Sequence, residues 1–124
     1  MDAMGGDRGV QATVDGAAML SREDVPIRIL LVGNAREIGE RLDQVSYDPT
    51  RLELVHADGH VRMDQSPGPM LDKLPNCSVL TAARLVQDGD ANALVSSGHT
   101  GALVLGAART FERLPGIRRA ALAS

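Results

Sequence analysis

Two short segments combine glycine with hydroxyl, imidazole or carboxyl side chains, and they are the strongest candidates for a chemical site in this chain. The first reads Asp2-Ala3-Met4-Gly5-Gly6-Asp7, and the second reads Ser96-Ser97-Gly98-His99-Thr100-Gly101. Glycine lets the backbone approach a ligand closely and turn its N–H groups toward an anion. The second segment also precedes an apolar helical pattern, and the N-terminus of a helix favours negative charge. We therefore expect the two segments to form an anion site, with phosphate as the preferred ligand.

Each segment also has a purely structural interpretation. Asp2 and Asp7 would orient a ligand or bind a cation, but a tight strand-to-helix turn with a capping aspartate explains the same residues. In the second segment, Thr100 would merely cap the helix while the glycines make the turn. Neither pattern is a P-loop, because no lysine follows the glycine, and neither has the spacing of a dinucleotide-binding turn. The local sequence leaves both interpretations open.

The long connection between residues 56 and 75 is the third candidate. It is rich in glycine and proline with little internal periodicity, and a stretch of this length without regular elements is typically functional. It contains Asp64 and the single lysine of the chain, Lys73. His56 and His60 lie four residues apart, but the segment has no helical pattern that would turn them the same way, so we expect no metal site.

The single cysteine, Cys77, is the last candidate. It excludes an intrachain disulfide and a cysteine-cluster metal site, and it fits a reducing cytoplasm. Beside a predicted helix start, it would serve either as a nucleophile or as a small buried hydrophobic residue. The second role is the commoner one, so we assign Cys77 no chemistry.

The strands that must position these segments show as short apolar runs. The clearest covers residues 27–32, and others are predicted at residues 52–55 and 93–96. Residues 2–3 look like the end of a further strand that feeds the first glycine turn. The chain thus places each glycine segment directly after a strand.

Between the strands, apolar residues at helical spacing predict helices. They are expected over residues 10–18, after Asn34, from residue 76 or 78 to Gly89, and from Gly101 to the stop at Pro115. Asn34 and Glu37 have the spacing of a capping box. The last helix is apolar on several sides, so we expect it to be buried between layers or at a subunit interface.

This alternation of strands and helices predicts an α/β fold with a mainly parallel sheet, because parallel neighbours need crossover connections. The 124 residues are enough for one domain. Both ends of the chain read as interrupted strands, at residues 2–3 and again at residues 120–124, so we expect a single incomplete domain over residues 1–124, truncated at both ends.

Charge and composition exclude several classes of protein. The net charge is -3 with both signs interspersed, which gives no footprint for nucleic acid. The first residues have neither the basic start nor the apolar run of a signal peptide, and no stretch is long and apolar enough for a membrane span. Aromatic residues make up only 2% of the chain, so aliphatic side chains must fill the core.

Six segments together carry a resemblance that no single one would support. They are residues 2–7, 29–33, 55–57, 63–64, 95–103 and 114–117. In order and spacing along nearly the whole chain, they resemble the bacterial phosphate acyltransferases of membrane phospholipid synthesis. The opening hexapeptide and the Ser-Gly-x-Thr-Gly-Ala-Leu segment are the more specific parts, and their joint occurrence is stronger than either glycine turn alone.

The resemblance implies an enzyme that moves a long-chain acyl group from acyl carrier protein to inorganic phosphate, with no cofactor and no metal. The acyl phosphate would pass to the next acyltransferase of the pathway. The fold implied is a three-layer α/β/α one, isocitrate dehydrogenase-like and phosphotransacetylase-like. The resemblance further implies a homodimer in the cytoplasm, loosely associated with the inner face of the membrane.

By the same analogy, phosphate lies between the two glycine turns. The catalytic residues implied are His99 and Thr100, and the binding residues implied are Asp2, Gly5, Gly6, Asp7, Ser96, Ser97, Gly98, Gly101, Asp64 and Lys73. Phosphate is itself the nucleophile, so the protein has to position it and stabilise the thioester oxyanion, while a neighbouring acid protonates the departing thiolate. Members of the family usually carry Asn where this chain has His99.

Three functional hypotheses follow. The first is a chain descended from phosphate acyltransferases, with weak or absent activity as an isolated polypeptide. The second is a noncatalytic fragment or phosphate-binding α/β module, and the third is a different α/β enzyme that acts on phosphate esters or nucleotides. Phosphate-dependent turnover supports the first, phosphate binding alone supports the second, and nucleotide binding supports the third.

Overall fold

Two parallel strands, β1 (Ile29–Gly33) and β2 (Leu52–His56), form the centre of the fold, and they pair from Ile29 opposite Leu52 to Gly33 opposite His56. The computed structural model describes residues 1–6 and 8–116 of the chain. Every residue of β1 is buried, whereas β2 is partly exposed. The strands predicted at residues 27–32 and 52–55 are therefore confirmed, with bounds shifted by no more than two residues.

The sheet continues beyond β1 through single residues. Asp2 forms a parallel bridge with Val32 of β1 on one side and with Ser96 on the other. The predicted strand at residues 93–96 is wrong as a full element, because only Ser96 forms a bridge. The opposite segment bends away at residues 4–6, directly after Asp2 and Ala3, so the pairing stays short. The parallel direction is as predicted.

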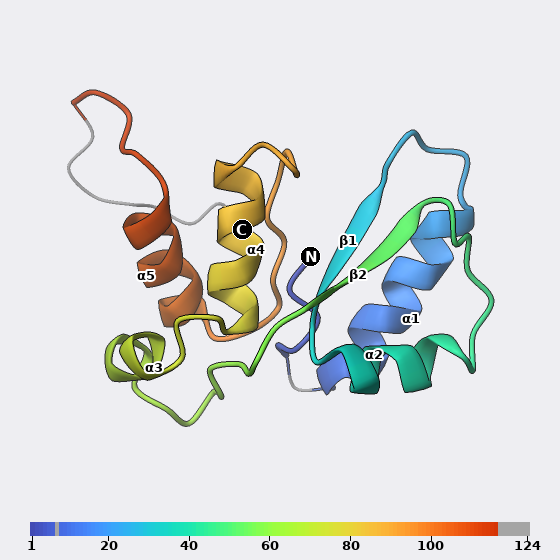
Figure 1. Cartoon of the computed structure of the whole chain (residues 1–124), viewed down its shortest axis with the longest axis horizontal. Coiled ribbons are helices and arrows are strands. Elements are labelled where there is room, and N and C mark those ends of the chain that lie inside the picture. The colour runs from blue at the N-terminus through green and yellow to red at the C-terminus, as the bar shows by residue number, and fades with distance from the viewer. Residues whose placement is uncertain (7, 117–124) are drawn as a thin grey trace.

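The described part of the chain contains five helices, three of which pack on this sheet (Figure 1). They are α1 (Gly9–Arg22), α2 (Ala35–Leu42), α3 (Pro67–Lys73), α4 (Ser78–Gln87) and α5 (Thr100–Thr110). Helices α1 and α2 cover one face of the sheet and α4 covers the other, with α5 packed on α4 and α3 packed on α5. The predicted three-layer α/β/α arrangement around a parallel sheet is confirmed.

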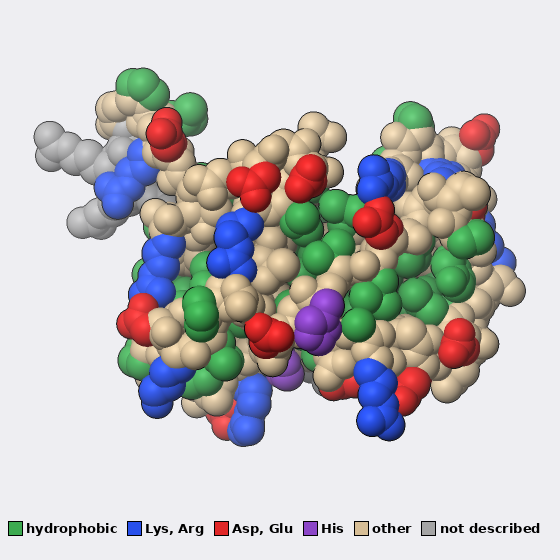
Figure 2. Space-filling view, viewed as in Figure 1, with side chains coloured by type: hydrophobic (Ala, Val, Ile, Leu, Met, Phe, Trp, Pro, Cys, Tyr) green, Lys and Arg blue, Asp and Glu red, His purple; other side chains and the backbone are tan. Residues whose placement is uncertain are grey.

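Aliphatic side chains fill the core on both faces of the sheet. On the first face, Val14 and Ala17 of α1 pack with Ile29 and Leu31 of β1 and with Ile38 of α2. On the second face, Ala82 of α4 packs against Val32 and Ala57, and a separate cluster joins the starts of α4 and α5. Figure 2 shows acidic and basic side chains interspersed over the surface in view, as the composition predicts.

The helix ends follow the predicted capping chemistry. The side chain of Asn34 accepts hydrogen bonds from the backbone N–H groups of Arg36 and Glu37, and its amide donates to the Glu37 carboxylate at 2.9 Å. Gly89, just after α4, has a φ of 85°, which only glycine adopts without strain. The sequence predicts both the Asn34 cap and the glycine after α4.

Two predictions about helices are wrong. The connection between residues 56 and 75 contains α3, which begins at Pro67 and buries Leu71. Proline is tolerated in the first turn of a helix because the N–H that it lacks has no partner there. Helix α5 ends at Thr110 instead of continuing to Pro115. Leu105 on its surface is exposed, so the helix is not buried between layers on every side, and its burial at a subunit interface stays a prediction.

Residues 120–124, where a further strand is predicted, lie outside the described residues. Over residues 1–6 and 8–116, no helix combines the length and the apolar character needed to cross a lipid bilayer.

Candidate functional site

The two glycine segments lie in direct backbone contact. A Cβ atom added to Gly5 would stand 2.2 Å from the Cα atom of Gly98, which no real side chain tolerates. Ser97 donates a hydrogen bond from its hydroxyl to the carbonyl oxygen of Gly5 at 3.2 Å. Gly6 has a φ of 93°, and a Cβ atom added to it would stand 2.9 Å from the Oγ atom of Ser97. The turns therefore touch because both lack side chains at the point of closest approach.

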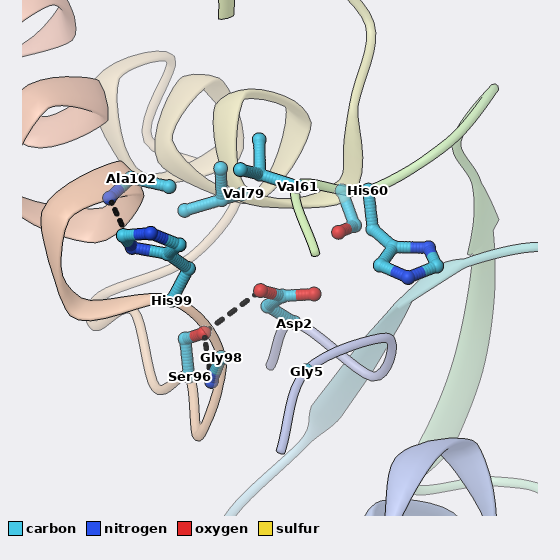
Figure 3. A pocket seen from close by; sticks show the side chains of 10 residues that line it. Asp2, Gly5, His60, Val61, Val79, Ser96, Gly98, His99 and Ala102 are labelled. Atoms are coloured by element: carbon cyan, nitrogen blue, oxygen red, sulfur yellow. Dashed lines mark hydrogen bonds between the residues drawn. The ribbon is translucent and has the colours of Figure 1, made fainter. Parts of the chain in front are cut away.

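A buried carboxylate holds the two turns in register. Asp2 is 4% exposed and accepts hydrogen bonds from the Ser96 hydroxyl at 2.7 Å and from the backbone N–H of Met4 at 3.1 Å. The Ser96 oxygen in turn accepts from the backbone N–H of Gly98 at 3.1 Å. Figure 3 shows the Asp2 and Ser96 side chains pointing toward one another across the gap between the turns. This chain of hydrogen bonds links the first segment to the second.

The side chain of His99 caps helix α5. Its Nδ1 atom accepts hydrogen bonds from the backbone N–H groups of Gly101 at 3.0 Å and Ala102 at 3.4 Å, and its Nε2 atom lies 3.1 Å from the carbonyl oxygen of Gln65. Because Nδ1 accepts from two N–H groups, Nε2 is the ring nitrogen that donates, to the carbonyl oxygen of Gln65. The proposed cap by Thr100 is wrong, because Thr100 is the exposed first residue of α5.

A small cavity opens where these groups meet the start of α4. It is lined by Asp2, Gly5, His60, Val61, Ser78, Val79, Ser96, Gly98, His99 and Ala102 (Figure 3). Its volume for a water-sized probe is about 10 Å³, which is room for roughly one water molecule or one ligand oxygen. Both α4 and α5 begin at this cavity, so the positive ends of two helices point toward it.

Ser78, the first residue of α4, brings an unsatisfied hydroxyl to the cavity. It is 1% exposed, and its Oγ atom has no hydrogen-bond partner within residues 1–6 and 8–116. A buried hydroxyl without a partner is unfavourable, so natural proteins rarely keep one without a reason. Sequence reasoning missed Ser78 because a hydroxyl at a helix start usually means an ordinary cap.

Several predicted site residues lie away from the cavity. Asp64 is exposed and pairs with Arg62 at 2.6 Å, and the hydrogen bond from Arg62 lowers the pKa of the Asp64 carboxyl. Lys73 is exposed at the last turn of α3. Gly101 packs against the His99 ring just inside α5. Asp7 lies outside the described residues. The cavity thus joins residues of the two glycine turns but includes neither Asp64 nor Lys73.

The remaining candidates of the sequence take structural positions. Cys77 is fully buried, and burial raises the pKa of its thiol, which favours the hydrophobic role over the nucleophilic one. His60 lines the cavity, whereas His56 is exposed beside Asp58. In the part of the chain that the structure describes, no group of three or more His, Cys, Asp or Glu side chains is arranged to hold a metal ion.

Comparison with known proteins gives a consistent result. Residues 1–124 match the model of a family described as fatty acid synthesis protein. The chain is 40% identical over its full length to a phosphate acyltransferase of Nitratidesulfovibrio vulgaris, 40% identical to one of Lawsonia intracellularis, and 41% identical to one of Shewanella amazonensis. It spans 36%, 35% and 36% of the lengths of these three relatives.

Proposed function

We propose, because the chain belongs to the fatty acid synthesis protein family, that its two glycine turns bind inorganic phosphate as the acceptor of an acyl group. The relatives that it matches are named phosphate acyltransferases. The observation that carries the proposal is the backbone contact between Gly5 and Gly98, which unites two segments that are far apart in sequence around one cavity. The helix ends beside them supply the positive potential that an anion requires.

The chemistry proposed is attack of a phosphate oxygen on the carbonyl carbon of an acyl thioester. The new C–O bond forms, the C–S bond breaks, and the leaving thiolate takes up a proton, so that acyl phosphate and a free thiol result. The chain has to position phosphate and stabilise the charge on the carbonyl oxygen. Thr100, the exposed first residue of α5, follows the cavity-lining His99 in sequence and is the proposed donor to that oxygen, and His99 is the proposed positioning residue that shapes the turn.

The partners proposed follow from the sequence resemblance. Acyl carrier protein is the proposed acyl donor, and the next acyltransferase of phospholipid synthesis is the proposed recipient of the product. A homodimer, a cytoplasmic location and loose membrane association belong to the same proposal. Asp64 and Lys73, both exposed and outside the cavity, are proposed to contact the carrier protein.

A two-part experiment tests the function. First, the melting temperature of the chain is measured with increasing phosphate, and binding to the folded state is expected to raise it. Second, acyl carrier protein thioester and phosphate are incubated with the chain, and hydroxylamine traps any acyl phosphate. The full-length Nitratidesulfovibrio vulgaris relative serves as the positive control. We expect the chain alone to bind phosphate and to form hydroxamate slowly, far below the rate of the control.

The possible results separate the hypotheses. Slow hydroxamate formation that requires phosphate and falls in the Thr100→Ala variant supports the acyltransferase. Phosphate binding without detectable hydroxamate favours a noncatalytic phosphate-binding module. A rise in melting temperature with nucleotides but not with phosphate contradicts both.

A further inference from the structure

The cavity proposed for phosphate already contains a negative group. Asp2 is 4% exposed, and the hydrogen bonds to its carboxylate come from Ser96 and Met4, which are neutral. Placing a second anion against a buried carboxylate is costly, because little water remains to screen the repulsion. Any oxyanion that binds here must therefore offer the Asp2 carboxylate a proton instead of a lone pair. This reasoning rests on the proposed function and asks which anion the site selects.

The cavity also limits what can touch Asp2. With about 10 Å³ it accommodates a single oxygen atom, so the rest of a tetrahedral oxyanion must remain at the opening. Ser78 lines the same cavity with a hydroxyl that lacks a partner within the described residues. A hydroxyl hydrogen can donate, so this group supplies a donor to the space that Asp2 faces as an acceptor.

We propose that the cavity takes the protonated oxygen of hydrogen phosphate. That oxygen donates its hydrogen to the Asp2 carboxylate and accepts a hydrogen bond from the Ser78 hydroxyl. The arrangement converts the repulsion between two anions into a charge-assisted hydrogen bond and gives Ser78 its missing partner. Asp2 and Ser78 are thus the residues that determine which oxyanion binds.

Sulfate is the discriminating ligand. It has the tetrahedral shape and nearly the size of phosphate, but it carries no proton at neutral pH, whereas phosphate and arsenate each keep at least one. Against Asp2, sulfate presents only lone pairs. The chain is therefore expected to bind phosphate and arsenate and to reject sulfate.

The experiment measures the affinity of the 124-residue chain for the three anions by titration calorimetry at pH 7 and constant ionic strength. We expect phosphate and arsenate to bind at least about tenfold more tightly than sulfate, the ratio that one charge-assisted hydrogen bond supports. In the Asp2→Asn variant, the amide N–H can donate to sulfate and the negative charge is gone. The preference for phosphate over sulfate should then fall to about twofold or less.

The Ser78→Ala variant tests the donor, with Ser21→Ala as its matched control. Ser21 is equally buried, but its hydroxyl donates to the carbonyl oxygen of Ala18 at 2.7 Å and accepts from the N–H of Asp48 at 2.9 Å. Ser78→Ala should weaken phosphate binding about tenfold without lowering the melting temperature, because the hydroxyl it removes has no partner to lose. Ser21→Ala should lower the melting temperature and leave phosphate affinity unchanged.

Equal affinity of the unmodified chain for phosphate and sulfate would overturn the inference while leaving phosphate binding intact, and no variant is needed to observe it. An unchanged phosphate-to-sulfate ratio in Asp2→Asn overturns the role of Asp2. If Ser78→Ala loses stability as Ser21→Ala does and keeps its phosphate affinity, the role of Ser78 is refuted. A chain that binds none of the three anions contradicts the proposed function together with this inference.

Discussion

At the scale of single residues, His99 shows how one side chain shapes a site through hydrogen bonds to the backbone. Its imidazole accepts from two N–H groups at the start of α5 and donates to the carbonyl oxygen of Gln65. These contacts tie the second glycine turn to the connection that follows β2. The N–H groups of Gly101 and Ala102 are consequently engaged with His99, and an oxyanion in the cavity must find its donors elsewhere, Ser78 among them.

Substitutions of His99 test this capping role. His99→Ala removes the acceptor and is expected to cost about 1 kcal/mol of stability in urea denaturation, the usual loss for a helix cap. His99→Asn should retain most of it, because asparagine is among the best capping residues. Equal destabilisation by Ala and Asn would show that the ring acts through packing.

Sequence reasoning found half of the residues that line the cavity but not their roles. Glycine, serine and histidine in the second segment suggested an anion site, and Ser96, Gly98 and His99 of that segment line the cavity. The cap by His99 instead of Thr100 was not predictable, because the contact between His99 Nε2 and the carbonyl oxygen of Gln65 joins residues 34 positions apart. Ser78 was missed because nothing in the local sequence reports that a hydroxyl is buried without a partner.

At the scale of elements, a bidentate ion pair joins α1 to α2 on their outer side. Arg41 of α2 donates from Nε and Nη2 to the two carboxylate oxygens of Asp15 on α1, each at 2.7 Å. The hydrogen bond from Arg41 lowers the pKa of Asp15 below its ordinary value of 3.8. These two helices pack on the first face of the sheet, so the ion pair between them helps to hold that layer together.

The pH dependence of the Asp15 contribution can be worked out. Because the folded pKa is lower than the unfolded one, the carboxylate stabilises the folded state above pH 3.8, and this contribution disappears as the pH falls through the lowered folded value. The stability difference between the unmodified chain and Asp15→Asn, measured by urea denaturation from pH 7 downward, should follow this course. Salt at about 1 M should reduce the difference at pH 7. A difference that grows toward acid would contradict the ion pair.

The sequence predicted those helices and strands whose formation depends on a few neighbouring residues. The apolar run of β1, the Asn34 cap and the glycine after α4 all act over a few residues, and the structure agrees with each. Helix α3 was missed because two prolines and a glycine near its start look like helix breakers. The strand at residues 93–96 was overpredicted, because pairing depends on a neighbour that sequence periodicity does not reveal.

At the scale of the whole molecule, the site depends on a backbone contact that tolerates no side chain. Gly5 and Gly98 approach so closely that even a methyl group would push the turns apart. The sequence indicated that both turns follow strands, and parallel strands bring such turns to the same edge of a sheet. The bridge between Gly59 and Cys77 holds the start of α4 next to the two turns, and no sequence motif predicted it.

Matched glycine substitutions test this contact. Gly5→Ala should destabilise the chain by about 1–3 kcal/mol, the usual cost of overpacking. It should also weaken phosphate binding strongly, because the added methyl group pushes apart the two turns that line the cavity. Gly16 lies in α1 with nothing within 4 Å of an added Cβ atom, so Gly16→Ala should raise stability by about 0.5–1 kcal/mol and leave binding unchanged. Calorimetric melting and phosphate titration of both variants provide the measurements. Unchanged phosphate affinity in a folded Gly5→Ala chain would contradict the contact.

The hydrogen bond between Asp2 and Ser96 spans 94 positions of sequence. During synthesis, Asp2 is made long before Ser96, so a nascent chain carries an acid without its hydroxyl partner until residue 96 has been added. Closing so large a loop is entropically unfavourable, and the sheet with α1 and α2 can assemble first from closer contacts. The cavity can therefore capture a ligand only after the Ser96 turn has docked on Asp2, and its occupancy would report that these two distant segments have come together.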